Sequence, residues 1–255
     1  MDLAGFQDHA TSLLLHLVRV AAFFAVVPLF GRQVESMLLR LVLAISFAAM
    51  FWWLGEQQVA TPPHLLELGL MGLREGLVGV ALGFAMSTMT SMLVSAGEFI
   101  SSEMGFSLAR AINPETGFDA TVVSQLLQTL GFLLILQLDL HHDALRVVEH
   151  TFRACPVGEP FDLVPIWDGV HALVAGSVEM ALQYSFPVLG VMLLLSVGTV
   201  LLSRAVPAIN LMEFVFALRV LIAIGMLALF LGEGAPFLLD YFHGVLDRTR
   251  AMFPG

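Results

Sequence analysis

Residues 97–125 read GEFISSEMGFSLARAINPETGFDATVVSQ, and they lie between two segments that are apolar enough to enter a membrane. The stretch carries five charged residues, one proline and three glycines. Lipid offers no hydrogen-bond partners to bare backbone amides. A polar, turn-rich segment in this position is therefore either an aqueous loop or irregular backbone that lines a protected cavity. The choice between these two interpretations largely decides the function.

The composition predicts an integral membrane protein with an all-α fold. The chain has 255 residues, of which 58% are hydrophobic, and a mean hydropathy of +0.89. Only 13% of the residues are charged, about half the usual share for a soluble domain. This length allows one domain, residues 1–255, with about six membrane spans. The net charge of −10 argues against nucleic acid as a partner, and a single cysteine, Cys155, excludes an intrachain disulfide.

Six apolar blocks follow one another along the chain, at residues 10–30, 37–54, 65–96, 122–138, 169–203 and 208–231. The fifth block would be about 52 Å long as one helix, which exceeds a hydrocarbon core of about 30 Å. Pro187 lies near its middle, so this block either kinks there or folds as a helical hairpin. Long kinked helices and hairpins suit a protein packed inside a larger helical assembly. The arginines obey the positive-inside rule badly, so the orientation of the termini stays open.

The third block carries a stripe of small residues, Gly72, Gly76, Gly79 and Gly83, which share one helix face. Such a stripe lets another helix approach closely, and that helix can belong to this chain or to another subunit. Methionines follow at every third position, at 86, 89 and 92. Flexible methionine fills irregular apolar gaps, so ordinary packing is favoured over a methionine seal that faces a pore.

Charged side chains interrupt the apolar helices. Each would cost about 2.5–3.5 kcal/mol at the centre of a bilayer on the insertion scale, so we expect them to face protein, to pair between helices or subunits, or to lie at the membrane rim. The alternatives are that the spans are misplaced or that much of the chain lies outside the bilayer. A proton relay at Glu75 or Glu179 is the less favoured interpretation. The expected set is Arg19, Arg74, Glu75, Glu98, Glu179, Glu213 and Arg219.

No motif indicates catalysis or a bound cofactor. Residues 139–143 read DLHHD, and His150 follows, but no HExxH or paired-cysteine pattern accompanies them. A polar helix boundary is therefore favoured over a metal site there. The chain also lacks GxSxG, P-loop and GxGxxG patterns. We therefore expect no enzyme, no cofactor and no metal.

Several stretches, in this order and spacing, resemble the FliR family of flagellar type III export apparatus proteins. The match covers nearly the whole chain. The stretches are Arg19 with the PLFG of residues 28–31, EG at 75–76 with Gly79 and GF at 83–84, AGE at 96–98, GFSLA at 105–109, NP at 113–114, HH at 141–142 with TF at 151–152, PVG at 156–158 and SRAVPAIN at 203–210.

This resemblance implies a subunit of a protein export gate in the bacterial inner membrane, within the flagellar basal body. FliP-like and FliQ-like subunits would join the chain in a helical channel, and the chain's own fold would resemble a fusion of a FliP-like and a FliQ-like subunit. FlhB-like and FlhA-like export proteins would lie nearby, unfolded flagellar proteins would be the cargo, and membrane lipid would surround part of the assembly.

The resemblance also implies a plug below the pore at about residues 105–125. Glycines and Asn-Pro supply hinges and turns, and apolar side chains supply the surface that fills the lumen. The plug residues are Gly105, Phe106, Leu108, Ile112, Asn113, Pro114, Gly117 and Phe118. Residues 97–104 are then expected to form the end of a long helix instead.

Two rival functions remain at this stage. The first is the virulence injectisome counterpart of the same part. The second, from a different class, is a secondary transporter for a small solute, because broken helices and buried charges also suit that architecture.

Overall fold

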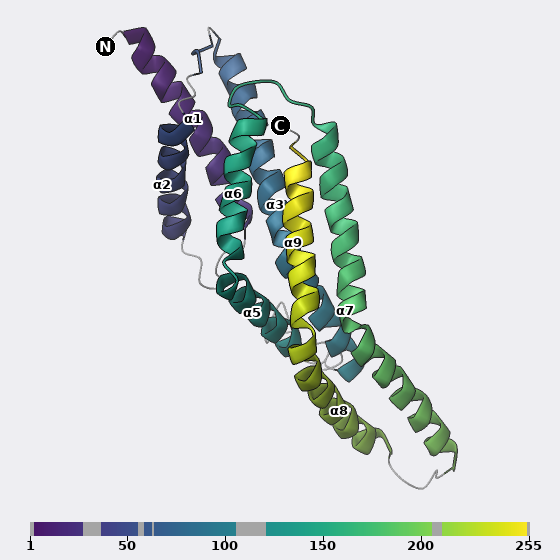
Figure 1. Ribbon diagram of the computed structural model, residues 1–255. Coiled ribbons are helices and arrows are strands. Elements are labelled where there is room, and N and C mark those ends of the chain that lie inside the picture. Colours follow the sequence, from purple (N-terminus) through teal and green to yellow (C-terminus); the bar gives the residue numbers. More distant parts are fainter. Residues whose placement is uncertain are drawn as a thin grey trace. The chain divides into compact units, whose positions relative to one another are not determined.

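The computed structural model is helical, as the composition predicts, and describes residues 3–27, 37–55, 59–62, 64–105, 121–205 and 211–253. Those residues contain eight helices and no strand (Figure 1). The helices are α1 (Leu3–Val26), α2 (Met37–Gly55), α3 (Leu65–Met104), α5 (Val122–Gln137), α6 (Leu140–Ala154), α7 (Val164–Ala205), α8 (Leu211–Glu233) and α9 (Ala235–Ala251).

The helices divide between two compact units, and each unit draws on separate parts of the chain. The first comprises Met1–Met89, Ile135–Val174 and His243–Gly255, and the second comprises Thr90–Leu134 and Ala175–Phe242. Four helices, α3, α5, α7 and α9, contribute residues to both units. The single domain of residues 1–255 stays a prediction.

Two helices are far longer than a bilayer is thick. Helix α3 has 40 residues and α7 has 42, about 60 Å each at the α-helical rise. The end of α3 at Met104 confirms that residues 97–104 continue the third apolar block as helix. Helix α7 runs through Pro187 without a break, so the hairpin alternative for this block is wrong. Proline removes one backbone hydrogen bond and does not stop the helix here.

Four helices are long and apolar enough to cross a membrane: Gly5–Val26, Met37–Gly55, Leu65–Met104 and Val164–Arg204. A fifth span is possible if α5 and α6, which meet at a bend of 72°, count as one. The expectation was about six. The last block yields only a shorter apolar helix, Val215–Leu229, within the part of the chain that was described.

The core of the first unit forms where α1 packs against α3. Leu15, Val20 and Phe23 of α1 are buried, as are Val78 and Leu82 of α3. Helix α2 packs on α1 from another side, where the rings of Phe24 and Phe47 lie 5.6 Å apart.

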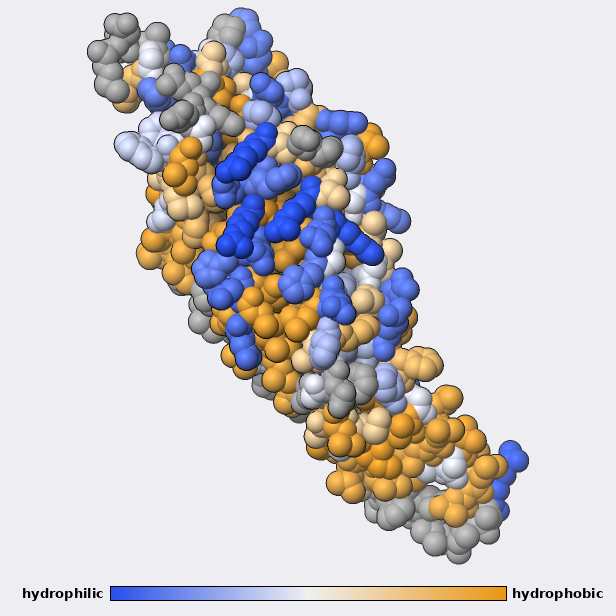
Figure 2. All heavy atoms as spheres, in the orientation of Figure 1, coloured by the Kyte–Doolittle hydropathy of each residue, from blue (hydrophilic) through white to orange (hydrophobic). Residues whose placement is uncertain are grey.

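Helix α6 packs against the rest of the first unit through one apolar face. Its buried residues include Val147, Val148 and Phe152, and the ring of Phe51 from α2 lies 5.2 Å from that of Phe152. Hydrophilic residues gather over the visible face of α6 (Figure 2). Asp139 occupies the position before the first turn of α6, which agrees with the expected polar helix boundary.

The second unit is built on the end of α3 and the start of α5. Leu93, Ala96 and Ile100 are buried, as are Val123 and Leu127. Met86 and Met89, in the first unit, and Met92, in the second, are all buried, which favours ordinary packing over a methionine seal exposed to a pore.

Candidate functional site

Thr121, where the segment 105–121 ends, is hydrogen-bonded to α3 within the second unit. The Oε1 atom of Glu98, on α3, accepts hydrogen bonds from the backbone N–H of Thr121 at 2.9 Å and from the hydroxyl of Ser124 at 2.9 Å. The hydroxyls of Ser101 and Thr121 lie 2.7 Å apart. We call Glu98, Ser101, Thr121 and Ser124 the clasp. It fixes the point where the chain returns to α5 against the last turns of α3.

Two glycines make the clasp and the exit of the segment possible. A Cβ atom on Gly97 would overlap the backbone of Ser124, so only glycine lets α5 come this close to α3. Gly105 has a φ of 86°, a left-handed conformation that glycine adopts without strain. Its N–H donates to the carbonyl oxygen of Ser102 at 3.1 Å and so ends the helix.

Of the expected plug residues, only Gly105 is among the described residues. Phe106, Leu108, Ile112, Asn113, Pro114, Gly117 and Phe118 all lie outside them. Residues 122–125, at the end of the expected plug, belong to helix α5, so the expected loop is too long at that end, and the plug role itself stays a prediction.

A buried ion pair holds the first unit together. The Nε and one terminal guanidinium nitrogen of Arg19, on α1, both approach Oε2 of Glu75, on α3, at 2.6 Å. The Arg19 side chain is 0% exposed and the Glu75 side chain 1%. Two charges this deeply buried stabilise a fold only if their remaining hydrogen-bonding atoms are also satisfied.

The remaining atoms of the pair do find partners, and all of them come from α6 or the chain that follows it. Arg19 donates to the carbonyl oxygens of Thr151 at 3.0 Å and Cys155 at 2.9 Å. Its guanidinium carbon lies 4.5 Å from the centre of the Phe152 ring, close enough for a cation–π interaction. The second oxygen of Glu75 accepts from the N–H of Gly158 at 3.0 Å. One ion pair thus joins α1, α3 and the connection from α6 to α7.

The other expected charges lie in different surroundings. Arg219 of α8 donates to the hydroxyl of Ser196 of α7 at 2.9 Å within the second unit. Arg74 and Glu179 are exposed on this chain, so the described part of the chain does not bury them, and their pairing with another subunit stays a prediction. The side chain of Glu213 lies outside the described residues.

Two glycines of the stripe, Gly79 and Gly83, pack against another helix of the same chain. A Cβ on Gly79 would overlap the backbone oxygen of Arg19, and one on Gly83 would lie 2.8 Å from the oxygen of Phe23. Gly76 has room, with its nearest neighbour Val18 at 3.8 Å, and Gly72 has nothing within 4 Å. Packing of α1 against α3 therefore explains Gly79 and Gly83 and leaves Gly72 open to another partner.

The sequence did not reveal the roles of the groups that complete both arrangements, although residues 151–152 are part of the resemblance to FliR. Thr121, Ser124, Phe152 and the carbonyl oxygens of Thr151 and Cys155 carry no charge, so only the three-dimensional packing shows their roles. The glycine at position 97 was the available signal, because a glycine inside an otherwise ordinary helix costs stability and usually marks a close approach.

A family model described as bacterial export proteins, family 1, matches residues 10–247. The chain belongs to this family. The match spans α1 through most of α9 and includes the clasp and the Arg19–Glu75 pair.

Relatives within the family extend over nearly the whole chain. "Flagellar biosynthetic protein FliR" of Bacillus subtilis is 29% identical over 229 residues, which covers 87% of this chain and 86% of that protein. The FliR of Caulobacter vibrioides is 28% identical, with 95% and 96% covered. "Surface presentation of antigens protein SpaR" of Salmonella typhimurium is 26% identical, with 89% and 85% covered. These similarities confirm the resemblance to FliR and support a component of a type III export apparatus.

Proposed function

We propose that this chain is a subunit of the flagellar type III export gate, where it assembles with FliP-like and FliQ-like subunits into a helical channel for unfolded flagellar proteins. The observation that carries the proposal is the family match over residues 10–247. FliR of Caulobacter vibrioides matches over 95% of this chain and 96% of its own length, which supports such a role for the chain.

Exposed apolar surface supports an assembly. Within the second unit, α7 exposes Phe186, Leu193 and Leu194, and α8 exposes Leu221 and Leu229. Figure 2 shows hydrophobic residues over the visible face of α8. Apolar surface of this extent is covered by lipid or by another protein, and the proposal assigns the cover to partner subunits and membrane lipid.

Within this channel, the proposal gives the segment 105–121 the role of a plug, since residues 122–125 belong to α5. A plug must leave and return to the same place, so its base has to stay fixed while its body moves. The clasp at Glu98 and the left-handed exit at Gly105 meet that requirement. The body of the plug, residues 106–120, lies outside the described residues.

The wider setting follows from the same proposal. The gate would lie in the bacterial inner membrane at the flagellar basal body, with FlhB-like and FlhA-like proteins as neighbours. In this proposal the chain helps unfolded proteins to pass through the gate and does not catalyse a reaction. The small-solute transporter is less well supported, because the family is one of export proteins. The injectisome counterpart remains a rival through SpaR.

Partner identification tests the proposal. The tagged chain is expressed in its own host, extracted in mild detergent and purified, and the proteins that accompany it are identified and counted. FliP-like and FliQ-like subunits at fixed ratios are expected, together with loss of motility when the gene is deleted. Partners encoded beside needle genes would instead support the injectisome. A monodisperse chain that transports a small solute alone would overturn the assignment.

A further inference from the structure

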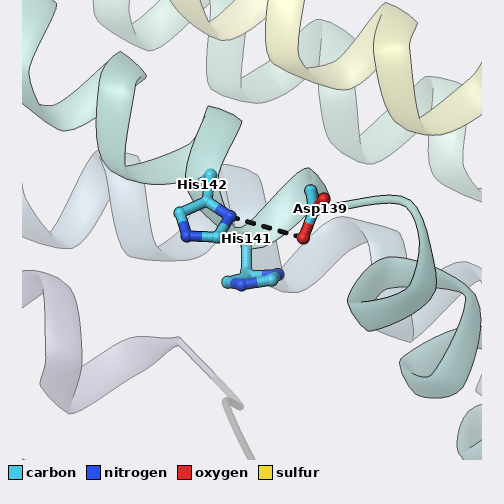
Figure 3. A group of neighbouring side chains, drawn as sticks. All are labelled: Asp139, His141 and His142. Atoms are coloured by element: carbon cyan, nitrogen blue, oxygen red, sulfur yellow. Dashed lines mark ion pairs between the residues drawn. The ribbon is translucent and has the colours of Figure 1, made fainter.

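The turn between α5 and α6 gathers three side chains that carry metal-binding atoms. Asp139 ends the turn in a left-handed conformation, with φ 55° and ψ 19°, and His141 and His142 lie in the first turn of α6. One ligand atom from each of the three lies within 4.8 Å of the other two. Figure 3 shows Asp139 beside the ring of His142, with His141 between them and below.

The separation of two of these atoms suits a shared ion better than a direct bond. Oδ1 of Asp139 and Nδ1 of His142 are 3.5 Å apart, whereas a charge-assisted hydrogen bond is about 2.7–2.9 Å long. Two ligands of a tetrahedral zinc ion, each about 2.0–2.1 Å from the metal, lie roughly 3.4 Å from one another by geometry. The rings of His141 and His142 have centroids 4.1 Å apart, so the third potential ligand lies beside the other two.

Two further observations indicate that Asp139 and His141 have ligand atoms available for a metal ion. An aspartate before a helix usually accepts a hydrogen bond from the first turn, but Asp139 makes no side-chain cap to α6. The Nδ1 atom of His141 is buried and has no hydrogen-bond partner among the described residues. A buried ring nitrogen without a partner is unfavourable, and a bound metal ion would satisfy it.

We propose that Asp139, His141 and His142 bind one divalent transition-metal ion of the zinc class at the α5–α6 turn. Two imidazoles and a carboxylate favour such an ion over calcium or magnesium, which prefer oxygen ligands. Three protein ligands leave a fourth position for water. The positive end of the α6 dipole opposes a cation, and the carboxylate of Asp139 offsets that effect. The ion would hold α5 and α6 at their bend of 72°.

Metal titration tests the proposal on the full-length chain purified in detergent and stripped with a chelator. Zinc binding is measured by calorimetry and cobalt binding by its visible absorption. One ion per chain is expected. Asp139→Asn keeps a residue that tolerates the left-handed backbone, and it should weaken binding by about tenfold or more, as should His142→Ala. His171→Ala, which removes an exposed histidine of α7, is the matched control and should leave binding unchanged.

The outcome decides the proposal independently of any role in export. Equal binding by the wild-type chain and by Asp139→Asn would overturn it, as would an equal loss in His171→Ala, since the ion would then be an adventitious ion only. Absence of binding at 100-fold excess of zinc over chain would also overturn it. Circular dichroism of each variant separates loss of the site from loss of the fold.

Discussion

The guanidinium of Arg19 and the carboxylate of Glu75 lie 2.6 Å apart, and both side chains are closed off from solvent. The pair joins α1 to α3, and the additional hydrogen bonds from Arg19 to Thr151 and Cys155 extend it to α6. Buried ion pairs contribute little net stability, because desolvation opposes the attraction. The loss of one partner is costly, however, because it leaves the other charge buried and unpaired.

We therefore predict that Glu75→Gln lowers the free energy of unfolding by about 3–5 kcal/mol. The change leaves the volume nearly unaltered and removes only the charge that faces Arg19. Denaturant titration of the detergent-solubilised chain, followed by circular dichroism, measures the effect.

The double variant Arg19→Met with Glu75→Leu is the control for this prediction. It removes both charges and refills the space with apolar atoms, so it should be more stable than Glu75→Gln alone. Some loss relative to the wild type should remain, since the carbonyl oxygens of Thr151 and Cys155 lose their donor. A single variant as stable as the wild type would contradict the proposed importance of the pair.

The glycine stripe gives a second prediction with its control on the same helix. Gly79→Ala should lower the free energy of unfolding by about 1–3 kcal/mol, because the new methyl group overlaps the backbone of Arg19 and drives α1 from α3. Gly72→Ala, which meets nothing within 4 Å, should raise the stability of the chain by about 1 kcal/mol through helix propensity. Unfolding titrations of the two variants are compared directly, and equal effects would contradict the packing at Gly79.

The sequence predicts the positions of helices that are apolar along their whole length. The blocks at 37–54 and 122–138 coincide closely with α2 and α5. Helices α6 and α9 were not among the blocks, because α6 has polar residues on one face and α9 is only weakly apolar. Hydropathy alone also could not decide whether Pro187 ends a helix, since that depends on the packing around it.

Pairing of the charges was harder to predict, because it depends on which helices meet. The cost of charge in lipid correctly required a partner for Arg19 and Glu75, but the rule does not name the partner. Arg74 and Glu179 are both exposed on this chain, and the rule does not tell whether the chain itself or another subunit covers such a residue. Their pairing with other subunits is a proposal. The clasp residues Thr121 and Ser124 escaped notice because neutral hydroxyls leave no signal in hydropathy.

Cys155 gives a prediction about pH. Burial raises the pKa of its thiol above the ordinary value, Glu75 raises it further, and Arg19 lowers it in part. The folded chain thus keeps the thiol proton at pH values where the unfolded chain loses it. The thiol's contribution to stability is therefore complete below the unfolded pKa and is lost as the pH rises through the folded pKa.

Alkylation rates report on this one thiol, because Cys155 is the only cysteine, and they respond both to its shielding and to its pKa. Between pH 7 and about pH 9, iodoacetamide should modify the folded chain more slowly than the chain unfolded in denaturant, since the thiolate is the reactive form. Equal rates across that range would show that the thiol is neither shielded nor shifted.

The clasp predicts a specific effect of Glu98→Ala. The N–H of Thr121 and the hydroxyl of Ser124 lose their shared acceptor, so the base of the segment 105–121 loosens. Limited proteolysis of the assembled complex should cut this segment at least several times faster. Glu103→Ala is the matched control, because it removes another carboxylate from α3 whose side chain makes no hydrogen bond to residues 121–125 in the described structure. Equal cleavage rates in the two variants would contradict the clasp.

Deletion within residues 106–118 tests the plug itself. If this segment closes the lumen, its removal should raise the passage of small ions through the assembled gate, while the clasp residues keep α3 and α5 in place. Ion flux is measured in cells or in liposomes that contain the purified complex, and subunit ratios confirm that assembly is intact. The wild-type complex and a complex with Glu103→Ala, which leaves the segment whole, set the background. Unchanged ion permeability in an intact deleted complex would remove the plug role from these residues, and the export assignment would then rest on the partner subunits alone.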